Sequence, residues 1–143
     1  MAEQDSTVDG QHGDAAPADG RSLKGPRGLR RMVSSTRHSL HGLGAAWRHE
    51  ESFRLEVMLA AVMVPVALLL PVSLVERILL IGVVALVLIV ELLNTAVEVA
   101  IDRDSYEINP LGKRAKDLSS AAVLVALLLA GGTWAAILVA RFA

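Results

Sequence analysis

Two long uncharged runs constrain this chain more than any other feature. Residues 57–75 and residues 118–140 contain no charged side chain over 19 and 23 positions. A helix rises about 1.5 Å per residue, so about 20 apolar residues cross the hydrocarbon core of a bilayer. A third uncharged run, residues 78–90, continues into a polar stretch that keeps helical periodicity. We therefore expect an all-α membrane protein with three transmembrane helices.

The domain organisation follows from where the apolar residues begin. Residues 1–28 are rich in Gly, Ala, Asp and Pro, and a composition with few large apolar side chains is typical of a disordered tail. Residues 29–143 are expected to form one membrane-embedded domain. It would comprise a surface helix over about 31–48 and transmembrane helices over about 53–71, 76–101 and 116–140. Pro65 is expected to kink the first of these or to remove one backbone hydrogen bond.

The segment before the first apolar run has the periodicity of an amphipathic helix. Val33, Leu40, Leu43 and Trp47 fall on one face, while the other face is basic and includes Arg37, His38, His41 and Arg48. Such a helix can lie at an anionic membrane surface or pack only on protein. We favour the surface helix because Trp47 suits the membrane interface.

Basic residues are distributed unequally between the two sides of the predicted membrane domain. Twelve Lys and Arg residues lie in the N-terminal segment and the loop between the second and third spanning helices, against two on the other side. Basic residues collect on the cytoplasmic side of a membrane. We therefore expect a multi-pass protein of the bacterial inner (cytoplasmic) membrane, with its N-terminus and second loop in the cytoplasm.

A polar stripe marks the second predicted spanning helix. Glu91, Asn94, Glu98 and Asp102 fall within about an 80° arc of a helix whose preceding half has no polar residue. An ionisable side chain at membrane depth costs several kcal/mol and indicates function. Glu91 would lie inside the bilayer, with Glu98 and Asp102 at or beyond its cytoplasmic edge. This placement favours chemistry between a lipid head group and a water-soluble reactant over conduction through a pore.

The available side chains restrict that chemistry. Cysteine is absent, which excludes a thiol nucleophile, and no phosphate-binding glycine motif is present. Carboxylate and Asn oxygens suit a Mg²⁺ ion that bridges nucleotide phosphates, and Lys supplies a positive charge for the phosphates. A buried carboxylate suits the general base of phosphoryl transfer. Glu91 is the only carboxylate deep enough for that base. The alternative is a non-enzymatic membrane subunit whose polar stripe holds an oligomer together. No nucleic-acid partner is expected.

The string ELLNTAVEVAIDR, the later segments AKD and SSAAVL, and the block GAAWRHEESFRLE resemble the bacterial integral-membrane diacylglycerol kinase family, which includes undecaprenol kinases. The resemblance runs from about Arg31 to the C-terminus and excludes the tail. It implies ATP as co-substrate, Mg²⁺ as cofactor, a membrane lipid alcohol as acceptor, and a homotrimer with active sites shared between subunits. The acceptor it favours is diacylglycerol, which would yield phosphatidic acid, with undecaprenol as the alternative.

The resemblance also implies roles for individual residues. Glu91 matches the general base and a lipid contact, and Glu50 and Glu98 match metal ligands that also bind nucleotide. Glu50 is preferred to its neighbour Glu51 because of its spacing from Trp47 and Phe53. The positions that match contacts to ATP or to the lipid are more numerous. For the nucleotide they are Arg31, His38, Glu107, Asn109, Lys116 and Asp117, and for the lipid Trp47, Asn94 and Ser120.

Overall fold

The computed structural model describes residues 29–104 and 109–143, with side chains from Val33 to Arg103 and from Asn109 to the C-terminus. The chain divides after Arg37 into two units, and the clefts and cavities described below are lined by residues of the second, residues 38–143. The described residues form four α-helices and no strand. The predicted all-helical fold is confirmed.

The amphipathic segment is helix α1, Leu29–His49. Its apolar residues Leu40, Leu43 and Trp47 remain exposed, with 45% of Trp47 accessible. Ala46 is buried in contrast, so α1 turns a narrow small-residue side towards protein and a wider apolar side outwards. Exposed apolar surface on an amphipathic helix is typical of one that contacts a membrane.

The first spanning helix is α2, Glu51–Leu69. It runs through Pro65 without ending there, and it stops just before Pro71, which disfavours helical conformation in the residue that precedes it. Leu70 accordingly has an extended backbone, with φ −62° and ψ 139°. Because α3 begins at Leu74, only a tight turn joins the two helices.

The second and third spanning helices are α3, Leu74–Asp104, and α4, Pro110–Phe142. As helices, both extend further into the connecting segment than the spanning ranges expected from the sequence, about 76–101 and 116–140. Asn109 caps α4 by accepting the Leu111 backbone N–H at 3.0 Å, and Pro110 occupies the first turn. Gly112 therefore lies inside α4, where a Cβ would sit 3.1 Å from the Ile101 side chain, so glycine permits the close approach of α3.

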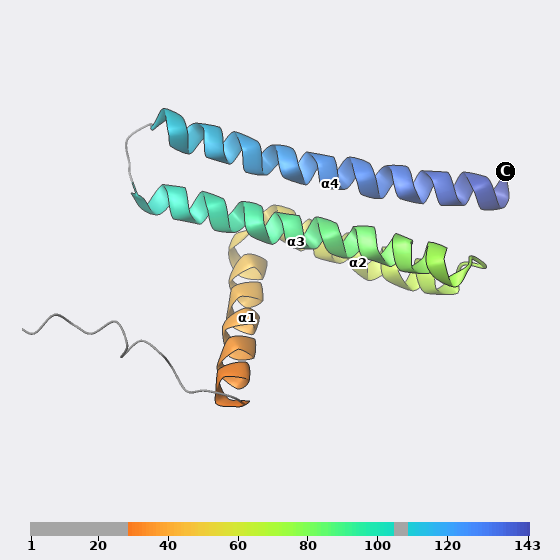
Figure 1. The fold of residues 1–143 in the computed structure, drawn as a ribbon, viewed down its shortest axis with the longest axis horizontal. Coiled ribbons are helices and arrows are strands. Elements are labelled where there is room, and N and C mark those ends of the chain that lie inside the picture. The colour runs from red at the N-terminus through yellow and green to blue at the C-terminus, as the bar shows by residue number, and fades with distance from the viewer. Residues whose placement is uncertain (1–28, 105–108) are drawn as a thin grey trace, which may run out of the picture. The chain divides into compact units, whose positions relative to one another are not determined.

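The core forms because α3 packs against both α2 and α4 (Figure 1). Leu80 of α3 is fully buried and belongs to one core cluster with Ala126 and Ala130 of α4, which lie four residues apart, whereas Ala122, four residues earlier, is exposed. Small residues at this spacing let spanning helices approach closely. The Trp134 indole N–H donates to the Leu80 carbonyl at 3.2 Å and fixes α4 against α3.

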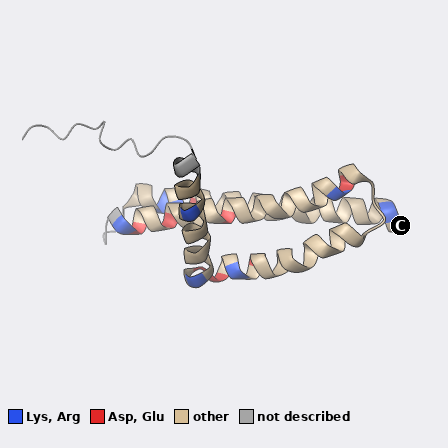
Figure 2. Ribbon diagram, turned by 90° about the horizontal axis from the view of Figure 1, so that it is seen from below, with Lys and Arg blue, Asp and Glu red and all other residues tan. Residues whose placement is uncertain are grey.

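Three of these helices are long and apolar enough to cross a membrane: Glu51–Leu69, Leu74–Arg103 and Pro110–Phe142. Charged residues concentrate towards the helix ends, and most of the length between them is uncharged (Figure 2). Many large apolar side chains on α2, α3 and α4 are exposed, which suits contact with lipid. The chain is a membrane protein, as predicted.

The end of the bundle at the α2–α3 turn, residues 67–77 together with Arg141, is called the turn end here. Ser73 and Glu76 form a reciprocal cap in which the Ser73 N–H donates to Glu76 Oε2 at 2.7 Å and the Glu76 N–H donates to Ser73 Oγ at 3.3 Å. The Arg77 guanidinium donates to the carbonyl oxygens of Ala67 and Leu70. The two Arg77 bonds satisfy carbonyls at the C-terminal end of α2 within the protein, which a membrane environment requires.

Candidate active site

The opposite end of the bundle contains the polar stripe and is called the polar end here. Glu91, Asn94 and Glu98 of α3 line one cleft of about 640 Å³. Only 5% of Glu91 is exposed, and among the described side chains it is the one charged residue that is buried. The helical periodicity of the stripe therefore does bring three predicted site residues together.

The other walls of the cleft come from α2 and α4. Glu51, Ser52, Leu55, Glu56 and Leu59 contribute from α2, and Ser120, Val123 and Leu127 contribute from α4. Leu55 is interleaved with the polar residues of α2, whereas Leu59 of α2 and Leu127 of α4 lie beyond the polar residues of their helices, further from the polar end. Such a cleft can hold an amphipathic molecule with its head group beside Glu91 and its tail towards the bundle interior.

Two buried oxygens in this cleft lack a hydrogen-bond partner. Asn94 donates from Nδ2 to Glu98 Oε1 at 3.2 Å, while its own Oδ1 has no partner. The second atom is Glu56 Oε2. Because an unpaired buried polar atom costs about 1–3 kcal/mol, a bound group that supplies hydrogen bonds would be favoured here.

Glu56 is the residue that sequence analysis missed. It reaches the cleft from α2 and is close enough to Glu91 for like-charge repulsion. The available signal was its position immediately before the uncharged run of α2, on the same helical face as Ser52. Neither observation identifies the face of α2 that meets α3, so the pairing of Glu56 with Glu91 required the structure.

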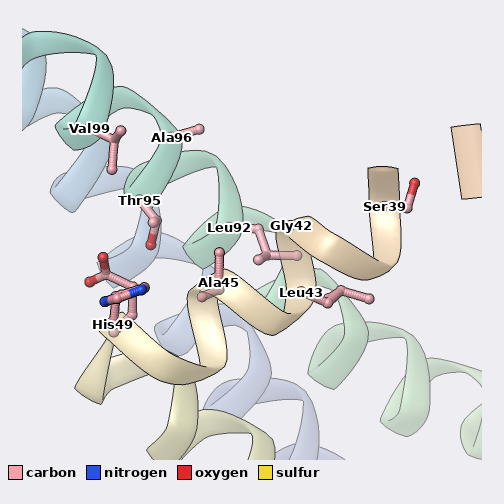
Figure 3. Close-up of a pocket in the computed structure, with 11 residues that line it drawn as sticks. Ser39, Gly42, Leu43, Ala45, His49, Leu92, Thr95, Ala96 and Val99 are labelled. Carbon is pink, nitrogen blue, oxygen red and sulfur yellow. The ribbon is translucent and has the colours of Figure 1, made fainter. Parts of the chain in front are cut away.

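The two adjacent glutamates at the start of α2 face different cavities. Glu51 lines the cleft with Glu98, whereas Glu50 lines a separate groove of about 730 Å³. Figure 3 shows this groove between residues 39–49 of α1 and the side of α3 that carries Thr95 and Val99. Glu50 still exerts like-charge repulsion on Glu91, as does Glu98. The chain by itself thus places Glu50 beside the site but not inside the cleft with Glu98.

Of the positions predicted to bind nucleotide, Asn109, Lys116 and Asp117 lie at or near the start of α4. Lys116 of α4 forms an ion pair with Asp102 of α3, and Asp117 forms one with Lys113 at 2.6 Å. Asn109 is engaged as the cap of α4, and His38 is exposed on α1. Glu107 and the side chain of Arg31 lie outside the described part of the chain.

The donor set of the cleft fits a hard divalent cation only in combination with a phosphate ligand. No group of three His, Cys, Asp or Glu side chains that could hold a metal occurs among the described residues. The cleft does offer the Glu98 carboxylate and the unpartnered Asn94 Oδ1, which are oxygen donors. Mg²⁺ is commonly bound by one or two carboxylates plus substrate phosphates, so these residues are compatible with it.

Fold and cleft together define a small helical membrane protein whose polar site lies near one end of its spanning helices. Residues 37–138 match the family model described as prokaryotic diacylglycerol kinase. The diacylglycerol kinase of Pseudomonas aeruginosa is 53% identical over 116 residues, covering 81% of this chain and 94% of that protein. The diacylglycerol kinase of Escherichia coli K12 is 43% identical over 115 residues, covering 80% and 94% respectively.

The diacylglycerol kinase of Haemophilus influenzae is also similar, with 43% identity over 111 residues that cover 78% of this chain and 94% of that protein. The chain belongs to the prokaryotic diacylglycerol kinase family and is a lipid kinase. The resemblance recognised from the sequence is thereby confirmed.

Proposed function

We propose that this protein transfers the γ-phosphoryl group of ATP to the hydroxyl of 1,2-diacylglycerol, giving phosphatidic acid and ADP. The observation that carries the proposal is the buried Glu91 in a cleft lined by both polar and apolar side chains. A lipid alcohol can place its hydroxyl beside that carboxylate while its chains stay in hydrocarbon. The names of the relatives favour diacylglycerol over undecaprenol as the acceptor.

Glu91 is proposed as the general base. Its carboxylate takes the hydroxyl proton as the lipid oxygen bonds to the γ-phosphorus, and the bond from that phosphorus to the β,γ-bridging oxygen breaks. Positioning and charge stabilisation supply most of the catalysis in such transfers. Asn94, which is held by its bond to Glu98, has Oδ1 available to orient the acceptor or the metal.

The remaining residues are proposed to bind the nucleotide and its metal. Mg²⁺, held by Glu98 and Glu50 together with the phosphates, would neutralise charge that develops in phosphoryl transfer. Lys116 and Asp117 would contact ATP at the exposed end of the cleft, and Arg31, His38, Glu107 and Asn109 are proposed as further contacts to the nucleotide. Trp47 and Ser120 would contact the lipid.

A homotrimer with shared sites is part of the proposal. The separation of Glu50 from the cleft supports it, since a neighbouring subunit could complete the metal site. The distribution of basic residues supports a bacterial inner-membrane location, with the polar end in the cytoplasm where ATP is available.

The decisive experiment measures transfer of labelled phosphate from ATP with Mg²⁺ in mixed micelles that contain diacylglycerol or undecaprenol. Wild type should label diacylglycerol, and Glu91→Gln should lower kcat by about 10²- to 10⁴-fold because the base is lost. Glu76→Gln, the same substitution at the turn end of the same helix, is the matched control and should stay active. Removal of Mg²⁺ with a chelator should abolish transfer.

Size-exclusion chromatography in detergent checks that both variants assemble as wild type does. If the protein prefers undecaprenol, the acceptor is undecaprenol instead of diacylglycerol, and the proposed mechanism is unchanged. An active Glu91→Gln protein would reject Glu91 as the base. A wild-type protein that is inactive towards both lipids would reject the proposed reaction.

A further inference from the structure

A second, narrower cavity adjoins the cleft at Leu59 and Leu127. Its volume is about 180 Å³, and it shares Glu56, Leu59 and Leu127 with the cleft. The carboxylate of Glu56 thus lies at the junction, and from there to Met63 and Gly131 the lining is apolar. We call this cavity the hydrocarbon pocket.

Gly131 leaves space in this pocket instead of closing it. Small residues in spanning helices usually permit close backbone approach. A Cβ built on Gly131 would meet no atom within 4 Å, so close packing does not account for the glycine. Glycine within a helix is destabilising relative to alanine by about 0.5–1 kcal/mol. At Gly131 this cost is not offset by closer packing of another helix, and its effect is to leave space in the pocket.

The size and lining of the pocket match a short length of hydrocarbon. An apolar cavity of about 150 Å³ remains dry and binds a six-carbon ring, and this pocket is slightly larger. Gly131 lies one helical turn beyond Leu127, about 6 Å further along α4. A chain that enters from the cleft would reach Gly131 after about the same distance.

We propose that the hydrocarbon pocket binds the first part of one acyl chain of the lipid alcohol, and that Gly131 sets how much chain it accepts. The proposal deepens and rests on the lipid kinase function proposed above. When the acceptor hydroxyl lies beside Glu91, the attached chain must leave through an apolar surface, and the pocket begins at the next level of the same cleft. The second chain would remain in the surrounding membrane.

Gly131→Leu tests the proposal because it fills the pocket from α4. Its matched control is Gly132→Leu, where a Cβ also meets nothing within 4 Å but the residue does not line the pocket. For Gly131→Leu, kcat/KM should fall about tenfold or more with dioleoylglycerol relative to dibutyrylglycerol, whose chains are too short to need the blocked space. Gly132→Leu should keep the wild-type ratio.

A direct measurement uses a diacylglycerol that carries a photoreactive diazirine about six carbons from the ester. Wild type should be labelled at Met63 or Leu127, as mapped by mass spectrometry, and Gly131→Leu should lose this label while Gly132→Leu keeps it. Labelling of wild type does not depend on turnover. Labelling without phosphorylation of any lipid would therefore reject the kinase function and still support the pocket.

Three results would overturn the pocket assignment. They are absence of pocket labelling in wild type, equal chain-length ratios for the two leucine variants, and a changed oligomeric state of Gly131→Leu with an unchanged ratio. The third would identify the cavity as a contact between copies of the chain. If Gly131→Leu fails to fold, the wild-type labelling pattern alone decides between these outcomes.

Discussion

The two ends of the bundle differ in whether all their buried polar atoms have partners. At the turn end, Ser73 and Glu76 satisfy each other, and Arg77 donates to two backbone carbonyls. At the polar end, Asn94 Oδ1 and Glu56 Oε2 are buried without a partner among the described residues. Polar groups that satisfy one another stabilise architecture, whereas buried groups left without partners are available to a ligand. The predictions below test this contrast.

Substitution of Asn94 by alanine should produce the largest of these effects. It removes the donor to Glu98 and the unpartnered oxygen together, so turnover should fall about 10²-fold or more. Thr95→Ala, on the side of α3 that faces the groove, should stay within a few fold of wild type. Equal losses in both variants, measured as kcat at saturating ATP and lipid, would show that α3 is sensitive at any position.

Glu56→Leu should separate activity from stability. Leucine removes a buried carboxyl oxygen that has no partner, so the free energy of unfolding should rise by about 1–3 kcal/mol. Turnover should fall about tenfold, because the cleft loses a polar group that is available to hydrogen-bond a bound lipid alcohol. Glu56→Gln, which retains hydrogen-bonding capacity, should recover part of the activity. Denaturation in micelles and the phosphate-transfer assay give the two readouts, and a fully active leucine variant would remove Glu56 from the site.

Arg77→Ala should show the reverse pattern at the turn end. The loss of two bonds to helix-terminal carbonyls should lower the free energy of unfolding by about 1–3 kcal/mol. Activity per folded molecule should remain within about twofold. Arg141→Ala removes a charge at the same end and should cost less than about 1 kcal/mol. A large loss of kcat in folded Arg77→Ala protein would contradict the division between the two ends.

Asp102→Asn should have the smallest effect. The ion pair with Lys116 is solvent-accessible, and exposed pairs contribute about 0–1 kcal/mol. Unfolding midpoints at low and high salt should therefore differ little from those of wild type. The KM for ATP is the more sensitive measurement. It should fall slightly, because Lys116 no longer pairs with residue 102 and can contact phosphate. A stability loss well above 1 kcal/mol would show that this pair belongs to the architecture.

Sequence patterns predicted those features that depend on a single helix. The spacing of Glu91, Asn94 and Glu98 places them on one face whatever surrounds the helix, and the structure puts them in one cleft. The uncharged runs likewise predicted three spanning helices, and three helices of the required length and composition are present.

Features that depend on contacts between helices could not be read in the same way. Which of Glu50 and Glu51 enters the cleft depends on how α2 is rotated against α3, and sequence spacing does not specify that rotation. The helix α4 begins at Pro110, before the spanning range of about 116–140 expected from the sequence, because an uncharged run does not show how far a helix continues beyond it. Asn109 and Pro110 begin the helix, and Gly112 fits it against Ile101.

The hydrogen bond from Trp134 to Leu80 has a spectroscopic consequence. The chain contains two tryptophans, and they lie in unlike surroundings: 45% of Trp47 is accessible beside the polar end, and 9% of Trp134 is accessible within the core. A water-soluble quencher should reduce the fluorescence of Trp47 and leave that of Trp134 largely unchanged. Fluorescence from the unmodified protein can therefore follow lipid arrival at one end and separation of α3 from α4 as two independent signals.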